Sequence, residues 1–369
     1  MGIEQWIRDS QENVSKFLSD YCIVNGEFLK LSDIEKWGYH DFINFVQSRI
    51  PKKLYKYFPN VADDNNVNYS LEAIVENTVH LSFPRVFDDI YDSDISMSFE
   101  LFQNLRLQEY CRRAGIVNVN NDGSEKSTEE LTSLLLHVIE KTEGDAVKIL
   151  NIFNSNLCSE IEKLANELFC RRFYFEISHN KADYSAALYT VLRTEYYKCL
   201  ESFKNTFKTT CFATTPYSQL MWGGSYGNCH HGLCIEYSVT DDEDFRGIYE
   251  NLFPLVYSKV RSNIEKDFIN QLDSFPSMDT LKDIYIHGAL RKSLDWSFQN
   301  EWRLLLMDGM PEMDESKVRF FPISKVYMGY RMAPEEREKV IMICRAKGID
   351  YATVKKRSDI FEMEEDKSQ

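Results

Sequence analysis

The 369-residue chain lacks the sequence features of an exported or membrane-spanning protein. It has no uninterrupted apolar run of about 18 residues, and its first segment, MGIEQWIRDSQENVSKFL, has no basic region followed by an apolar core. The nine cysteines are odd in number and form no CxxC pair, which is typical of reduced thiols. We therefore expect a cytoplasmic protein that has no membrane partner.

Basic residues are outnumbered. The 43 Lys and Arg residues face 58 Asp and Glu residues, so the formal net charge is -15 and the whole-protein field repels phosphate backbones. Lys52, Lys53 and Lys56 form a local basic group that could override this field, but such a group is commonly a solvated edge. Nucleic-acid binding is therefore not favoured.

Internal repeats and low-complexity tracts are also missing. Apolar material is plentiful, because 43% of the residues are hydrophobic and 14% are aromatic. This composition excludes a disordered chain, and the length favours about two domains or one domain with an insertion.

Hydrophobic periodicity predicts a mixture of helices and strands, with a frayed acidic tail EMEEDKSQ. The N-terminal residues 1–50 have the pattern of two amphipathic helices, the second around residues 32–50. Other helices are expected at residues 70–77, 264–271, 278–289 and 334–347. Strands are expected at residues 53–58, 79–83, 210–214, 232–239, 254–257, 299–306, 325–330 and 350–354.

The order of these elements predicts an α+β protein whose mixed β core is assembled from both ends of the chain. Residues 1–52 are expected to form an N-terminal helical cap, and residues 53–98 together with 208–369 the α/β core. Residues 99–207 show apolar side chains at helical spacing almost throughout, so we expect a large helical insertion that offers a surface to a partner protein.

A first candidate site segment combines the strand at residues 53–58 with Ser82 on the next strand. Side chains alternate along a strand, so Tyr55 and Tyr57 share one face and Lys56 lies on the other. Either the tyrosine face or Lys56 can line a cleft. The alternative is a half-buried strand with ordinary aromatic packing.

A second candidate is the acidic turn that contains Asp88, Asp89, Asp92 and Asp94. Carboxylates this close together can bind Mg²⁺ or Mn²⁺ through oxygen ligands. The alternative is a solvated turn in which the aspartates cap backbone amides.

A third candidate is the glycine-rich segment at residues 221–232, which carries Trp222, Tyr226 and His230. Glycines let the backbone approach a flat polar ligand closely, and the aromatic rings offer faces for stacking. A glycine-rich hairpin with no ligand is an equal alternative. Zinc is disfavoured because Cys229 and Cys234 have no second pair of ligands elsewhere.

A fourth candidate is the predicted strand at residues 299–306, on which Gln299, Glu301 and Arg303 share one face. Three polar side chains in a row do not cover a core, so they face water, an ion pair or a ligand. A surface ladder in which Arg303 pairs with Glu301 is the alternative.

As an ordered set, these motifs resemble the bacterial domain-of-unknown-function family 2971. The similarity runs from about residue 53 to the C-terminus, interrupted by the helical middle, and its motifs are LeuTyrLysTyr, HisLeuSer, PheAspAspIleTyrAsp, MetTrp, HisGlyLeuCysIleGlu, GluTrpArg and ValTyrMetGly. The family frequently occurs beside mobile elements, which implies a role in antiphage defence or as a toxin.

A looser similarity is to mono-ADP-ribosyltransferases. It implies that NAD is the substrate, that Lys56 or its tyrosine neighbours contact the NAD phosphates, and that Ser82 supports the nicotinamide ribose. Glu301 would be the catalytic acid and Gln299 would select the acceptor, a protein or a small molecule of unknown identity. The predicted catalytic residues are Glu301, Gln299 and Arg303. The predicted cofactor-binding residues are Tyr55, Lys56, Tyr57, Ser82, Asp88, Trp222, Tyr226 and His230.

Three functions follow from these residues. An ADP-ribosyltransferase-like enzyme or NAD hydrolase is the leading hypothesis, and it requires no metal ion. A metal-dependent nuclease or phosphoesterase would instead use the acidic turn and Glu301. A non-enzymatic sensor would use the helical middle to bind its partner.

Overall fold

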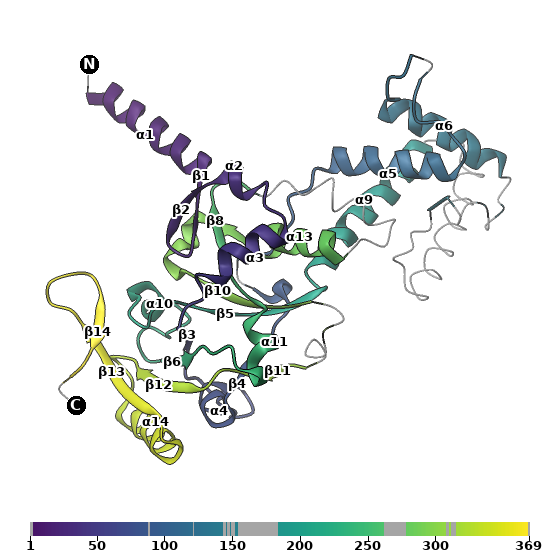
Figure 1. Ribbon diagram of the computed structural model, residues 1–369. Coiled ribbons are helices and arrows are strands. Elements are labelled where there is room, and N and C mark those ends of the chain that lie inside the picture. The colour runs from purple at the N-terminus through teal and green to yellow at the C-terminus, as the bar shows by residue number, and fades with distance from the viewer. Residues whose placement is uncertain are drawn as a thin grey trace. The chain divides into compact units, whose positions relative to one another are not determined.

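The structure is a computed structural model that describes residues 3–87, 89–120, 122–142, 145, 148, 152–153, 184–261, 278–307, 310 and 315–367 (Figure 1). The fold is mixed α+β and contains several sheets. The chain divides into two compact units. Unit 1 comprises Met1–Ser93, Lys204–Arg261 and Ala289–Gln369, and unit 2 comprises Asp94–Phe203 and Ser262–Gly288.

The largest sheet of unit 1 has five strands in the order β14-β13-β12-β6-β3. It joins an early segment to the C-terminal part of the chain, because β3 pairs antiparallel with β6 and β6 pairs antiparallel with β12. Strand β13 runs parallel to β12, and helix α14 (Pro334–Lys347) makes the connection between them. The strands are β3 (Lys53–Phe58), β6 (Leu233–Ser238), β12 (Ile323–Met328), β13 (Asp350–Lys356) and β14 (Met363–Glu365).

A second sheet of unit 1 has the order β5-β10-β7, and all six residues of its central strand β10 (Trp302–Met307) are buried. Strand β5 (Phe207–Phe212) and strand β7 (Leu252–Pro254) pair with it on either side. A bridge between Tyr55 and Ala213 links this sheet to β3, and a bridge between Ser82 and Thr209 links it to the segment after β4 (Thr78–His80). Strand β4 itself pairs with β11 (Lys317–Arg319).

The N-terminal residues form a β-hairpin as well as helices. Strands β1 (Tyr21–Val24) and β2 (Glu27–Lys30) pair with each other, and β1 continues into a sheet with β8 (Val256–Ser258) and β9 (Arg291–Ser293). The expectation of two helices only was therefore wrong. The helices here are α1 (Ile3–Asp20), α2 (Leu31–Ile34) and α3 (Tyr39–Gln47).

Short helical segments connect the strands of unit 1. They are α4 (Tyr69–Glu76), η1 (Pro84–Val86), α10 (Gln219–Gly223), η2 (Glu243–Phe245), α11 (Arg246–Tyr249) and η3 (Leu294–Gln299). Two of them lie beside the cleft described below. Segment η1 follows β4 directly in the chain, and η3 directly precedes the residues that lead into β10.

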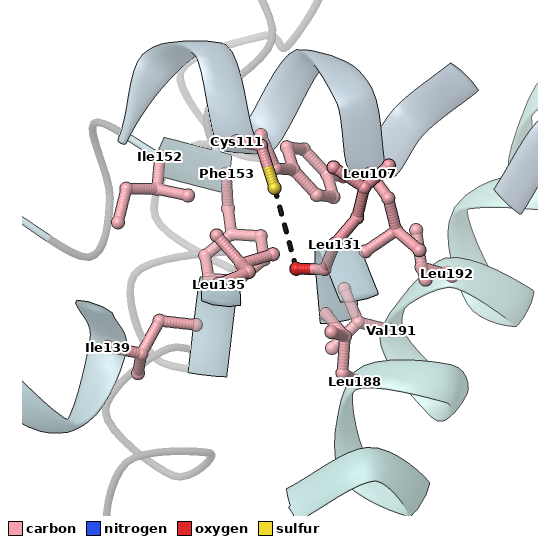
Figure 2. Close-up of a cluster of buried hydrophobic side chains, with 11 residues drawn as sticks. Leu107, Cys111, Leu131, Leu135, Ile139, Ile152, Phe153, Leu188, Val191 and Leu192 are labelled. Atoms are coloured by element: carbon pink, nitrogen blue, oxygen red, sulfur yellow. Dashed lines mark hydrogen bonds between the residues drawn. The ribbon is translucent and has the colours of Figure 1, made fainter. Parts of the chain in front are cut away.

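Unit 2 is helical in its described part, with α5 (Phe99–Arg113), α6 (Thr128–Lys141), α9 (Tyr184–Phe203) and α13 (Met278–Ala289). Helix α6 lies within the segment that was expected to be helical, and Ser127 and Glu130 form a capping box at its start. Side chains from α5, α6 and α9 pack in one apolar cluster, in which the thiol of Cys111 donates a hydrogen bond to the carbonyl of Leu131 (Figure 2). Burial of such residues stabilises each helix through its apolar face.

Most of the other predicted elements are confirmed, with shifted ends. The predicted bounds of β3, α13 and α14 agree with the structure at both ends. The helix expected at residues 264–271 lies outside the described residues. The tail prediction was wrong in part, because β14 is a paired strand. No helix in the described part of the chain is long and apolar enough to span a bilayer.

Three strands of the large sheet meet at two glycines that leave no room for a side chain. A Cβ atom on Gly232 would lie 2.2 Å from the carbonyl oxygen of Phe58, and one on Gly329 would lie 2.2 Å from that of His230. Both obstacles are backbone atoms, which cannot move without displacing a strand.

We expect Gly232→Ala to lower the free energy of unfolding by at least about 2 kcal/mol, because overpacking displaces the ends of β3 and β6. Gly223→Ala is the matched control, since the nearest atom to its Cβ, Nε2 of His230, would be 3.8 Å away. The control should change stability by less than about 1 kcal/mol. Urea denaturation measures both values, and equal losses in the two variants would contradict the prediction.

Candidate functional site

A cavity of about 440 Å³ opens in unit 1 and brings together residues that are distant in the sequence. Its volume lies within the range of about 300–1,000 Å³ that is common for ligand pockets. Its walls come from β3, β5, the β4–η1 segment, the glycine-rich segment and the residues before β10. The lining residues are Tyr55, Lys56, Tyr57, His80, Ser82, Val86, Phe87, Asp92, Thr209, Thr210, Cys211, Phe212, Ala213, Met221, Tyr226, Lys292, Gln299 and Glu301.

Glu301 lies in the wall of this cleft as one member of a closed ring of four buried charges. Its Oε1 accepts hydrogen bonds from Nε and Nη2 of Arg303 at 3.0 and 2.8 Å, and its Oε2 accepts one from Nζ of Lys292 at 3.2 Å. Asp92 closes the ring, because it receives both terminal nitrogens of Arg303 at 2.9 Å and lies 3.2 Å from Nζ of Lys292. The two negative charges of the acids are therefore matched by two positive charges inside the protein. We call these four residues the charge ring.

The charge ring keeps its carboxylates ionised although they are buried. Burial alone raises the pKa of Asp92, but Arg303 and then Lys292 outweigh it and lower this pKa to about 2. The same two cations lower the pKa of Glu301 against its own burial. In return, the two carboxylates raise the pKa values of Lys292 and Arg303 despite the burial of these cations.

Gln299 is held beside Glu301 in one orientation. Its Oε1 accepts a hydrogen bond from Nζ of Lys292 at 2.9 Å, and its amide nitrogen donates to the hydroxyl of Tyr226 at 3.4 Å. Gln299 ends the helical turn η3, and Asn300 follows with φ of +40°, so the strand begins only at Trp302. The prediction that Gln299 and Glu301 lie on a strand was wrong, yet both side chains line the cleft.

Lys56 lines another part of the wall, where its ammonium group donates to Oγ1 of Thr210 at 2.8 Å and to the carbonyl of Cys211 at 3.1 Å. Burial lowers the pKa of Lys56, while Cys211 and Glu301 oppose this effect. Burial also raises the pKa of the Cys211 thiol to about 12, so this cysteine is a poor nucleophile.

Several predicted residues do meet in the cleft. They are Tyr55, Lys56, Tyr57, Ser82, Tyr226, Gln299 and Glu301. Ser82 is placed by two backbone hydrogen bonds with Thr209, of 2.9 and 3.0 Å. Tyr57 donates its hydroxyl hydrogen bond to the carbonyl of Thr215, which directs this side chain partly away from the cavity.

Other predicted residues lie elsewhere. Trp222 is fully buried, its indole nitrogen donates to the carbonyl of Pro216 at 2.7 Å, and its ring contacts Tyr57 edge-on, so its faces are not open to a ligand. His230 lines a separate cavity near residues 356–363. Arg303 is fully buried and lies outside the cavity lining, behind Glu301. Asp88 lies outside the described residues.

The acidic turn does not gather its carboxylates around one point. Asp92 faces the two cations of the charge ring, whereas Asp89 accepts a hydrogen bond from the backbone amide of Tyr91. Within the described ranges, no group of three or more His, Cys, Asp or Glu side chains is placed to hold a metal ion.

The sequence did not predict that Lys292 contacts Glu301, or that Asp92 shares the two cations that hold Glu301. Lys292 stands in the same motif as Gln299 and Glu301, seven and nine residues earlier, and this short spacing was an available signal. Asp92 and Arg303 are 211 residues apart, and no local pattern reveals such a pair.

Comparisons with family models, with curated proteins and with solved structures each return no match. The resemblance to domain-of-unknown-function family 2971 therefore rests on the motifs alone and stays a prediction.

Asp92→Asn should lower the free energy of unfolding at pH 7 by about 3–5 kcal/mol, because it leaves the buried cations under-compensated. The folded-state pKa of about 2 lies below the ordinary 3.8. The carboxylate therefore stabilises the native state above about pH 4, and this contribution is lost as the pH falls towards 2. The difference between wild type and variant should shrink over that interval.

Asp89→Asn is the control for this prediction, since its Oδ1 acceptor survives the change and it has no ion pair among the described residues. It should alter stability by less than about 0.5 kcal/mol. Urea titrations at a series of pH values measure both variants, and a pH-independent deficit for Asp92→Asn would contradict the account.

Proposed function

We propose that this protein is an NAD-using enzyme that cleaves the bond between nicotinamide and ribose, as an ADP-ribosyltransferase or an NAD hydrolase. In the same proposal, the sheets around the cleft form an ADP-ribosyltransferase-like core. The observation that carries it is the carboxylate of Glu301, ionised and only 5% exposed, in the wall of a cavity also lined by Gln299, Ser82 and Lys56.

The chemistry of this cleavage requires a fixed negative charge. When the bond between C1′ of the ribose and the nicotinamide nitrogen breaks, its electron pair leaves with neutral nicotinamide and the ribose becomes oxocarbenium-like. A preorganised carboxylate in a site shielded from water stabilises that positive charge by several kcal/mol. Water or an acceptor group then attacks C1′ and loses a proton.

The ring contacts indicate which oxygen serves the substrate. Oε1 of Glu301 accepts two hydrogen bonds from Arg303, whereas Oε2 has a single charged donor, Lys292. A carboxylate oxygen has about two lone-pair sites, so Oε2 has the greater capacity to accept a hydrogen bond from a ribose hydroxyl. Arg303 and Asp92 are positioning residues in this scheme, because they fix the carboxylate without contacting the ligand.

The neighbouring side chains are suited to hold the rest of the nicotinamide riboside. The amide of Gln299 is oriented by Lys292 and Tyr226, and Ser82 also lines the cavity. The ring of Tyr226 offers a surface for a flat heterocycle, which takes over the stacking that the sequence also assigned to Trp222. Orientation of this kind contributes to the rate by reducing the entropy lost at the transition state.

A metal-dependent reaction is less well supported. Two of the acids that it would use, Asp92 and Glu301, are already bridged by the cationic groups of Lys292 and Arg303.

Glu301→Gln should reduce nicotinamide release from NAD by roughly 10²–10³-fold, because the neutral amide does not stabilise the developing positive charge. Labelled NAD and chromatography of the released nicotinamide give the rate, and calorimetry gives the affinity for NAD. The affinity should change far less than the rate, since the charge develops only in the transition state.

Glu236→Gln is the matched control. Glu236 is another buried carboxylate on β6, it accepts hydrogen bonds from Ser324 and Tyr327 of β12, and it does not line the cleft. This variant should also lose stability but keep its activity below its melting temperature. Full activity of Glu301→Gln, or wild-type protein that neither binds NAD nor releases nicotinamide, would contradict the proposed function.

A further inference from the structure

Beside the cleft lies a group of basic side chains that form no ion pair with any carboxylate in the part of the chain that the structure describes. Lys208 directly precedes Thr209 of the cavity wall, Arg85 directly precedes Val86 of the wall, and His80 lines the cavity itself. The cationic groups of Arg85 and Lys208 each lie 5.2 Å from the centre of the Phe83 ring. We call the cations Arg85 and Lys208, together with the neighbouring imidazole of His80, the cationic rim.

No described carboxylate neutralises the rim. Nζ of Lys208 donates to the backbone carbonyl of Glu315 at 2.9 Å, and no side chain of the rim forms an ion pair with any carboxylate that the structure describes. Lys317 differs from the rim residues in this respect. It pairs with His80 across β4 and β11, and its ammonium group forms ion pairs with Glu72 at 2.7 Å and Glu76 at 3.4 Å. In a chain of net charge -15, two neighbouring cations without an ion pair in the described ranges form a distinct positive patch.

The local field is strong enough to act on His80. Burial lowers the pKa of His80, and Lys56, Lys317 and Lys208 lower it further. These lysines come from three different strands, β3, β11 and β5, so positive charge surrounds the imidazole from several directions. Among these three lysines, Lys317 forms ion pairs with described carboxylates, those of the two glutamates of α4.

The cations continue from the rim into the cleft. Residues 208 and 210 lie on the same face of β5, because side chains alternate along a strand. Lys56 donates to Oγ1 of Thr210 and to the carbonyl of Cys211, and a lysine has three N–H donors, so one remains for a ligand. Cys211 in turn contacts Glu301. The charge therefore changes along this side of the cleft, from the cation of Lys208 next to the wall to the carboxylate of Glu301 within it.

We propose that the cationic rim binds the phosphate groups of a nucleotide whose heterocyclic end enters the cleft. Phosphate oxygens are strong acceptors for lysine and arginine, and the imidazole N–H of His80 adds a further donor. The ligand is thus a phosphorylated nucleotide rather than a nucleoside or free nicotinamide. A small nucleotide suits a cavity of about 440 Å³, whereas the net charge of the chain repels a nucleic acid. The inference deepens the proposed function, since NAD has a pyrophosphate at the corresponding position.

Calorimetry of the full-length protein with inorganic pyrophosphate, ADP-ribose and nicotinamide riboside tests whether the rim binds phosphate groups. Lys208→Gln should weaken the binding of pyrophosphate and of ADP-ribose by roughly tenfold or more, because one charge-assisted contact is lost. It should leave the affinity for nicotinamide riboside within about twofold. Arg85→Gln, a change at an exposed side chain, provides a second variant whose folding is not at risk.

Lys317→Gln is the matched control, because it removes a nearby lysine whose charge is already balanced. It should change the affinity for ADP-ribose by less than about threefold. Equal weakening by Lys208→Gln and Lys317→Gln, no binding of pyrophosphate to the wild type, or tighter binding of a single-stranded oligonucleotide than of ADP-ribose would overturn the inference.

These experiments distinguish a wrong proposal about phosphate binding at the rim from a wrong proposal about the reaction. Pyrophosphate binding that depends on Lys208, without any cleavage of NAD, would support the rim and reject the reaction. Cleavage of NAD with a KM that Lys208→Gln and Arg85→Gln leave unchanged would reject the rim and support the reaction.

Discussion

The ion-pair ring of Asp92, Lys292, Glu301 and Arg303 is the constraint on which the candidate site depends. It ties together the turn after η1, the end of β9 and the start of β10, and it holds an ionised glutamate where a lone buried carboxyl would take up a proton. Buried ion pairs can often be replaced by apolar residues without loss of stability. What the ring supplies that an apolar core does not is a negative charge at a defined position beside a cavity.

The cleft therefore combines a negative charge, the carboxylate of Glu301, with positive charges in and next to its wall. Glu301, Gln299, Lys56 and His80 line the cleft, and Lys208 and Arg85, which have no ion pair among the described residues, lie next to wall residues in the chain. A ligand with an electron-poor ring and a phosphorylated tail matches both kinds of charge, whereas a ligand of uniform charge matches only one. The strongly negative net charge of the chain makes the local cationic group more selective for small anions than for nucleic-acid backbones.

The sequence predicted well the elements that carry their own local signals. Helix α14 begins at Pro334 in its first turn and ends before Gly348, which has φ of +66°, and its predicted bounds were therefore right. The hairpin of β1 and β2 was missed although Asn25 and Gly26, both with positive φ, form a well-known turn signal.

The site was harder to predict because its geometry depends on contacts between distant residues. The polar residues of the cleft could be named from their types, but not that Asn300 would end a helical turn between Gln299 and Glu301. Nor could the alternation of a strand reveal that Arg303 would lie behind Glu301 and bind Asp92, 211 residues earlier. Trp222 is an aromatic residue of the type that stacks on ligands, yet its hydrogen bond to Pro216 and its burial make it part of the core.

The most direct test of the central claim is a crystal structure of the protein with a non-hydrolysable NAD analogue. The account predicts a ribose hydroxyl at hydrogen-bond distance, roughly 2.6–3.2 Å, from Oε2 of Glu301, while Arg303 and Lys292 keep their contacts with the carboxylate. An analogue bound away from the cleft, or one whose ribose does not reach Glu301, would contradict it.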